Sequence, residues 1–112
     1  SYCHQARTEL LRKLGIHDKL LEENNVMLPV ISFEISYKKP AHYDELLTIK
    51  TTIKEIPKLR FKFEFEIFAP QGVLLSTARS TVVFVNKDNR HPVSTPKIVK
   101  NAMESKFKAI DA

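Results

Sequence analysis

The sequence predicts an α+β domain in which one amphipathic helix covers a sheet of four long strands. The first fifteen residues repeat apolar side chains at helical spacing, which is typical of a helix with one buried face. Residues 59–68 alternate between apolar and charged side chains, which is typical of a strand with one buried face. A sheet with a phenylalanine-rich face must be covered, and the N-terminal helix is the available cover.

The helix at residues 1–15 is predicted to bury one stripe of side chains. Gly15 suits the left-handed position that follows a last helical turn. Arg7 belongs to the polar remainder of the helix. Lysine at position 10 should unfold the domain, because it would bury an unpaired charge. The predicted stripe consists of Tyr2, Cys3, Ala6, Leu10, Leu11 and Leu14.

Four strands are predicted after this helix. Pro29 indicates an edge, a bulge or a strand entry in the first of them. Residues 69–72 predict the turn of a hairpin between the last two strands. Residues 81–85 are apolar on both faces, as expected for a strand that is buried on two sides or lies at a subunit contact. The predicted strands cover residues 26–39, 45–56, 59–68 and 73–86.

Two further helices are predicted. Asp18 is a suitable N-cap for a short helix that ends at about Glu23. Thr95 is a suitable N-cap for a C-terminal helix over about residues 97–108, with Pro96 at its first position. Its apolar side is expected to carry Ile98, Val99, Ala102, Met103 and Phe107. With no repeats or linkers, residues 1–112 are interpreted as a single domain.

Composition limits the class of protein. A hydrophobic content of 43% and a charged content of 28% are ordinary for a soluble domain. No apolar run approaches the ~20 residues of a membrane-spanning helix. The single cysteine, Cys3, cannot form an internal disulfide, which favours a reducing, cytoplasmic location. The net charge of +5 favours anionic partners, but nucleic acid is not expected, because the phenylalanines alternate away from the lysines.

The residues alone predict no catalytic motif, no metal site and no cofactor site. The loop PAHYDE at residues 40–45 places an aromatic hydroxyl beside a carboxylate, although Asp44 can simply stabilise the turn. A basic set is either a solvated surface or a phosphate site. This set comprises Lys58, Arg60, Lys62, Lys87 and Arg90.

Three stretches, in this order, resemble the 4-hydroxybenzoyl-CoA thioesterase family of hotdog-fold proteins. They are YCHQARTELLRKLG at residues 2–15, residues 40–49 and residues 83–92. The closer resemblance is to the acyl-CoA thioesterase branch that includes the thioesterase of the Tol–Pal cluster. It implies a hotdog fold, in which a long antiparallel sheet wraps around one central helix, here with an added C-terminal helix.

The resemblance also implies an activity and an assembly. The expected protein hydrolyses the thioester of a short-chain or aromatic acyl-CoA, whose coenzyme A is part of the substrate. The expected homo-oligomer is a dimer, commonly a tetramer, with sheets joined edge to edge and sites between subunits. The alternative is a non-catalytic hotdog module that binds an acyl thioester or a protein partner.

The family uses an acidic residue, usually Asp, together with backbone N–H groups at the N-terminal end of the helix. The resemblance places that Asp, the first strand and the catalytic loop before Ser1, so no catalytic residue is assigned. His4 stands where the family usually has Glu. The expected substrate-binding residues are Tyr2 and His4 at the mouth of the acyl site, Tyr43 and Asp44, and Arg60 and Arg90 for the phosphates.

Overall fold

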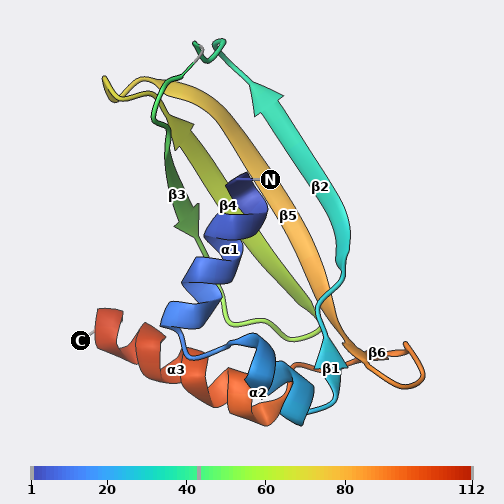
Figure 1. Ribbon diagram of the computed structural model, residues 1–112. Coiled ribbons are helices and arrows are strands. Elements are labelled where there is room, and N and C mark those ends of the chain that lie inside the picture. The colour runs from blue at the N-terminus through green and yellow to red at the C-terminus, as the bar shows by residue number, and fades with distance from the viewer. Residues whose placement is uncertain (1, 43, 112) are drawn as a thin grey trace.

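The computed structural model describes residues 2–42 and 44–111, with side chains through Ser105. Two helices come first, the strands follow, and a third helix comes last, which confirms the predicted α+β class (Figure 1). The elements are α1 (Tyr2–Lys13), α2 (Asp18–Glu23), β1 (Val26–Met27), β2 (Val30–Tyr37), β3 (Thr48–Thr52), β4 (Arg60–Phe68), β5 (Leu74–Asn86), β6 (Pro92–Val93) and α3 (Lys97–Asp111).

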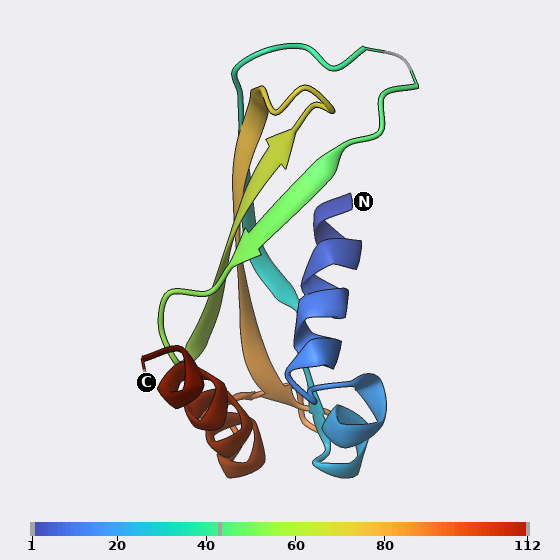
Figure 2. The same cartoon turned by 90° about the vertical axis from the view of Figure 1, so that its left-hand side faces the viewer.

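One antiparallel sheet forms the body of the molecule. Its main strands follow the order β3-β4-β5-β2, and the short strands β1 and β6 pair with the last residues of β5. Helix α1 lies against one face of the curved sheet, whereas α2 and α3 lie at the end away from the β2–β3 loop (Figures 1 and 2). Among the described residues, no helix combines the length and the apolar character needed to cross a bilayer.

The alternation predicted over residues 59–68 is confirmed along β4, but Leu59 precedes β4 and is exposed, so its place on the buried face is wrong. Phe61, Phe63 and Phe65 are buried on the face toward α1. Small residues of β5 stand beside two of them, with Ser80 opposite Phe63 and Ala78 opposite Phe65. The rings of Phe61 and Phe63 stack with centroids 4.5 Å apart. Each such side chain contributes about 1.5–3 kcal/mol by its burial.

Two predicted strands are shorter in the structure. The strand expected over residues 26–39 divides into β1 and β2 around Pro29, and the β2–β5 register shifts between Val30 and Ser32. Pro29 lacks an N–H, which explains an interruption at this point. Of the strand expected over residues 45–56, only β3 is paired, and its partners are residues 64–68 of β4. The predicted hairpin is confirmed: Gly72 has φ +87° and donates its N–H to the carbonyl of Ala69.

Helix α1 buries a different stripe from the one predicted. Its buried residues are Cys3, Arg7 and Leu11, spaced four residues apart. Arg7 is 8% exposed, so its assignment to the polar side is wrong, whereas Tyr2 is 66% exposed and does not belong to the stripe. The partly buried residues that pack against the core are Ala6, Leu10 and Leu14.

The helix ends confirm one prediction and correct two. Gly15 has φ +83°, as predicted for the residue after α1. His17 caps α2 in place of Asp18, because its Nδ1 accepts the N–H of Leu20 at 3.3 Å. Thr95 does not cap α3: its N–H and its hydroxyl both donate to the carbonyl of Lys58, at 2.8 Å and 2.6 Å. Thr95 therefore ties the segment before α3 to the β3–β4 loop.

Helix α3 closes one end of the core. Val99 and Met103 are buried, as predicted, but Ile98 is exposed and does not belong to the apolar side. The side chain of Phe107 lies outside the described part of the chain.

Candidate functional site

An apolar groove of about 740 Å³ opens where the first turn of α1 meets the end of β2. Most of its wall is aromatic or aliphatic, and its charged side chains come from the loop after β2. We call this set of residues the apolar groove. It is lined by Tyr2 and Cys3 of α1, Phe33, Ile35 and Tyr37 of β2, residues 38–41, and Leu47, Ile67, Leu75 and Ser76.

The β2 side of the groove continues the core face of the sheet. The register places Phe33 opposite Ser80, Ile35 opposite Ala78 and Tyr37 opposite Ser76. Although they share the face that is buried on β4 and β5, these three β2 side chains are 48%, 40% and 79% exposed. The sheet thus extends beyond its helical cover as an open apolar surface.

Two lysines stand at the mouth of the groove. Lys38 and Lys39 are exposed, and their backbone N–H groups both donate to the carbonyl of Leu75, at 2.9 Å and 3.0 Å. These hydrogen bonds hold the start of the β2–β3 loop against β5. The lysines create a positive potential next to an apolar wall, which suits a ligand with an apolar part and an anionic part.

The end of α1 that borders the groove is also electropositive. The first helical N–H groups have no partner inside a helix, and the helix dipole places partial positive charge at this end. No acidic side chain in the first turn of α1 offsets that charge. Negative charge that develops in a molecule bound here would be stabilised.

A second, smaller cavity of about 230 Å³ lies between α1 and the sheet. It shares Cys3 and Phe33 with the apolar groove, and it also contains His4, Arg7 and Ser80. Nη2 of Arg7 lies 2.8 Å from Nδ1 of His4. Because a guanidinium only donates, this ring nitrogen is the acceptor. Burial lowers the pKa of the Arg7 guanidinium, which nevertheless stays charged at neutral pH.

The family follows from a match along most of the chain. Residues 1–103 match the model of the thioesterase-like superfamily. The chain belongs to this superfamily. It is 33% identical to YneP of Bacillus subtilis over 87 residues, which are 78% of this chain and 63% of YneP. It is 33% identical to the acyl-CoA thioesterase YbgC of Haemophilus influenzae over 102 residues, which are 90% of this chain and 74% of YbgC.

A solved structure supports the fold. The DHNA-CoA thioesterase of Staphylococcus aureus superposes with a TM-score of 0.84 and 26% identity, over 98% of this chain and 75% of that protein. The predicted hotdog architecture is confirmed, as is the predicted resemblance to acyl-CoA thioesterases. The chain spans less than two thirds of the length of YneP.

The structure gathers two predicted site residues at one end of α1. Tyr2 lines the apolar groove and His4 lines the smaller cavity. Asp44 is exposed in the β2–β3 loop, where it has φ +63°. Tyr43 lies outside the described residues. The substrate-binding roles that the sequence resemblance implies for these four residues stay predictions.

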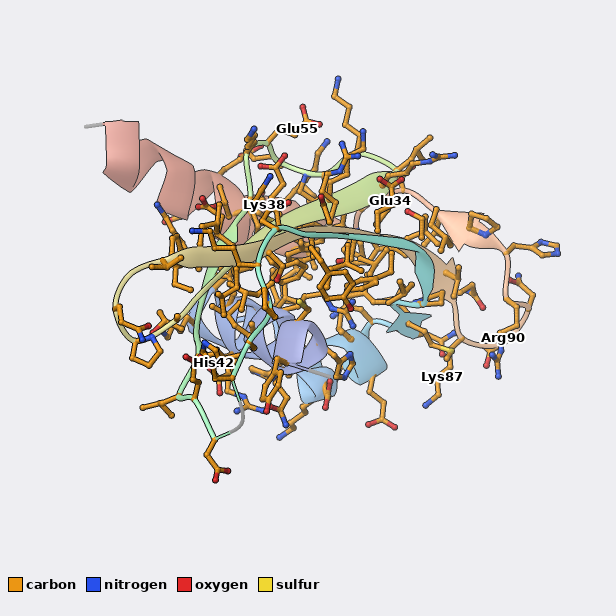
Figure 3. The ribbon with its side chains drawn as sticks, turned by 90° about the horizontal axis from the view of Figure 1, so that it is seen from above. Glu34, Lys38, His42, Glu55, Lys87 and Arg90 are labelled. Atoms are coloured by element: carbon orange, nitrogen blue, oxygen red, sulfur yellow. The ribbon has the colours of Figure 1, made fainter. Side chains whose placement is uncertain are left out.

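The two predicted phosphate ligands lie at the other end of the sheet. Arg60 begins β4 and is seven residues from Ile67 of the groove, or about 23 Å along a strand. Arg90 lies in the turn after β5 and is also exposed. Figure 3 shows Lys38 and His42 on one side of the molecule and Lys87 and Arg90 on the other. Lys38 and Lys39 line the groove, whereas Arg60 and Arg90 are not among its lining residues.

Arg7 and Ser80 are the residues that the sequence did not reveal. A charge in the middle of a helix is normally solvated, so Arg7 reads as polar surface until the structure shows which side faces the sheet. Ser80 lies in a strand with several Ser and Thr residues, and only its register opposite Phe33 and Phe63 identifies it as a core position.

Neither a reactive thiol nor a metal-binding cluster is found in the part of the chain that the structure describes. Burial raises the pKa of the Cys3 thiol, which stays protonated and poorly nucleophilic at neutral pH. In residues 2–42 and 44–111, no group of three or more His, Cys, Asp or Glu side chains is placed to hold a metal.

Proposed function

We propose that the protein hydrolyses acyl-CoA thioesters and accepts a short-chain or aromatic acyl group. The observation that carries this proposal is the apolar groove at the first turn of α1, in a member of the thioesterase-like superfamily. The acyl group packs against Phe33 and Ile35. The phosphates of coenzyme A extend toward Lys38 and Lys39 at the mouth.

Hydrolysis adds water to the thioester carbonyl and breaks the carbon–sulfur bond, which releases a carboxylic acid and the thiol of coenzyme A. The carbonyl oxygen lies next to the first turn of α1, whose N–H groups stabilise the negative charge of the tetrahedral intermediate. Among the described residues that line the groove, none carries a carboxylate. In this proposal, the carboxylate that activates water as a general base comes from outside this set of residues.

A second copy of the chain completes the site at the β2 edge. Strand β2 pairs with β5 on one side only among the described elements, which leaves a row of unpaired N–H and C=O groups. Val30, Ile31 and Phe33 are 45–49% exposed on this strand. Edge-to-edge pairing would satisfy the backbone and cover these side chains. A cytoplasmic location fits this assembly and the unpaired Cys3.

The second candidate is a hotdog module that binds an acyl thioester without cleaving it. None of the described residues that line the groove carries a carboxylate, and the resemblance places His4 at the position of a Glu, so these residues also fit binding without turnover. Alternatively, the module binds a protein partner, and coenzyme A does not occupy the groove.

The decisive experiment uses the full natural chain and a panel of acetyl-, butyryl-, hexanoyl- and benzoyl-CoA. Release of the coenzyme A thiol measures hydrolysis, and calorimetry with coenzyme A measures binding. We expect turnover of at least one panel member. Binding without turnover would favour the module, and the absence of both binding and turnover would contradict both candidates.

A further inference from the structure

The small cavity beneath α1 contains a charge with no counter-charge. Arg7 is buried, and Nη2 of its guanidinium lies 2.8 Å from Nδ1 of His4. In the part of the chain that the structure describes, no ion pair joins Arg7 to a carboxylate, and the ion pairs that do form lie on the surface. A buried cation is costly unless an anion compensates it. A carboxylate that entered this cavity from elsewhere would compensate the charge of Arg7.

A second unsatisfied polar group lies in the same cavity. Ser80 is 2% exposed, and its Oγ has no hydrogen-bond partner in the described part of the chain. The register places Ser80 between Phe33 and Phe63, so apolar rings flank the hydroxyl on both sides. Buried hydroxyl groups are nearly always hydrogen-bonded, and an exception requires an explanation. The cavity thus presents two kinds of donor, a guanidinium and a hydroxyl, at one place.

The remaining walls of the cavity are apolar. Val30, Phe33 and Phe65 surround the polar groups, and Cys3 and Phe33 also line the apolar groove. A ligand that enters by the groove can extend past Cys3 and Phe33 to reach Arg7. The fitting ligand has an apolar arm and a terminal group that accepts several hydrogen bonds and carries negative charge. A carboxylate meets these requirements, because a guanidinium binds it through two parallel hydrogen bonds.

We infer that Arg7 and Ser80 form a buried carboxylate site, which selects acyl groups that end in a second carboxylate. The substrate class is then the CoA monothioester of a dicarboxylic acid. This inference rests on the proposed thioesterase function, since it places the acyl group in the apolar groove. It makes Arg7 a specificity-determining residue, with no part in the bond-breaking step.

The test compares two thioesters with five-carbon acyl groups: glutaryl-CoA, which ends in a carboxylate, and pentanoyl-CoA, which ends in a methyl group. With the full chain, we expect binding or kcat/KM to favour glutaryl-CoA by roughly tenfold to a hundredfold. Arg7→Met should abolish the preference, because it lowers kcat/KM for glutaryl-CoA much more than for pentanoyl-CoA, and Arg7→Lys should keep only part of the preference. Equal use of both thioesters by the wild-type protein would overturn the inference.

The variants are expected to fold. Methionine has an apolar stem of similar length, and replacing an uncompensated buried charge by an apolar side chain is often neutral or stabilising. Ser80→Ala provides a milder variant that removes one donor and keeps the charge, and it should reduce the preference severalfold. His4→Glu provides an internal carboxylate three residues from Arg7, which should occupy the guanidinium and remove the preference without any change at Arg7.

A probe without a thioester separates the two proposals. Butanoate should raise the melting temperature of the wild-type protein and leave that of Arg7→Met unchanged. If no acyl-CoA binds but butanoate has this effect, the proposed thioesterase function fails and the carboxylate site stands. If butanoate has no effect and Arg7→Met dissociates the oligomer, a carboxylate of a second copy pairs with Arg7, and the inference is wrong.

Discussion

Nη2 of Arg7 lies 2.8 Å from Nδ1 of His4, one turn earlier on α1. This contact connects an exposed imidazole to a guanidinium that is buried against the sheet. Because a guanidinium donates hydrogen bonds and cannot accept them, Nδ1 of His4 is the acceptor in this contact. The acceptor at position 4 is therefore part of what makes the burial of Arg7 tolerable.

A lysine at position 4 should destabilise the fold. His4→Lys replaces the acceptor of Arg7 by a second cation, and the expected loss is about 1–3 kcal/mol in the free energy of unfolding. His4→Gln keeps an acceptor and serves as the matched control, with a smaller expected loss. Urea unfolding followed by circular dichroism measures both. Equal stability of the lysine and glutamine variants would show that Arg7 does not need the acceptor.

Leu11, and not Leu10, should be the most sensitive leucine of α1. Leu11 is buried in the core, whereas Leu10 is only partly buried. Leu11→Ala is expected to cost about 2–5 kcal/mol, and Leu10→Ala less. Leu46, which is 84% exposed, provides a control whose alanine variant should stay within ~0.5 kcal/mol of the parent. A larger loss of unfolding free energy for Leu10→Ala than for Leu11→Ala would show that α1 presents a different face to the core.

Gly15 tests the end of α1 without interference from packing. Its φ of +83° disfavours any residue with a Cβ, yet no atom lies within 4 Å of the place where that Cβ would stand. The cost of Gly15→Ala is therefore a backbone cost, expected at about 1 kcal/mol. Gly15→Asn should cost less, because Asn tolerates the left-handed region. A neutral alanine variant in thermal unfolding would contradict this conformation.

Cys3 should be unreactive in the folded protein and should link stability to alkaline pH. The buried thiol has a raised pKa, so the folded state keeps a proton that the unfolded state releases above about pH 8.5. Stability from this group is present below that pH and falls as the pH rises. Cys3→Ala should remove this component, measured as the difference between the two proteins from pH 7 to pH 10. Rapid alkylation of Cys3 at pH 7 without denaturant would disprove its burial.

The β2 edge should govern assembly. Ile31 is 49% exposed on β2 and does not line the apolar groove. Ile31→Lys adds a charge to the surface at which we place the second copy, and sedimentation should show a shift from dimer to monomer. Leu46→Lys is the matched control, since Leu46 is equally apolar and lies outside β2. A dimer that survives Ile31→Lys unchanged would argue for a different interface.

The spacing of apolar side chains predicted the main helices and strands, because this spacing depends only on which face of a single element is buried. The alternation in residues 59–68 identified Phe61, Phe63 and Phe65 as core residues, and Gly15 identified the end of α1. The caps were harder to assign. His17 and Thr95 make hydrogen bonds that depend on which neighbouring group happens to be reachable, and residue preferences alone do not reveal that.

The candidate site was less predictable because it depends on contacts between distant segments. Tyr2 and His4 were expected at the mouth of the acyl site; Tyr2 lines the apolar groove, and His4 lines the smaller cavity beside it. The placement of Arg60 at the far end of the sheet follows from its position on β4, seven residues from the groove. Arg7 and Ser80 line one cavity because the register of β5 places position 80 on the face of the sheet toward α1.

The most direct test of the central claim is the rate of acyl-CoA hydrolysis by two charged variants of the full chain. Ile35→Glu places a carboxylate in the wall of the apolar groove, and Leu59→Glu places one at an exposed apolar position outside it. If the groove holds the acyl group, Ile35→Glu should lose roughly tenfold or more in kcat/KM for the best thioester, while Leu59→Glu keeps the parental value. Equal activity of both folded variants would contradict the assignment of this groove as the acyl site.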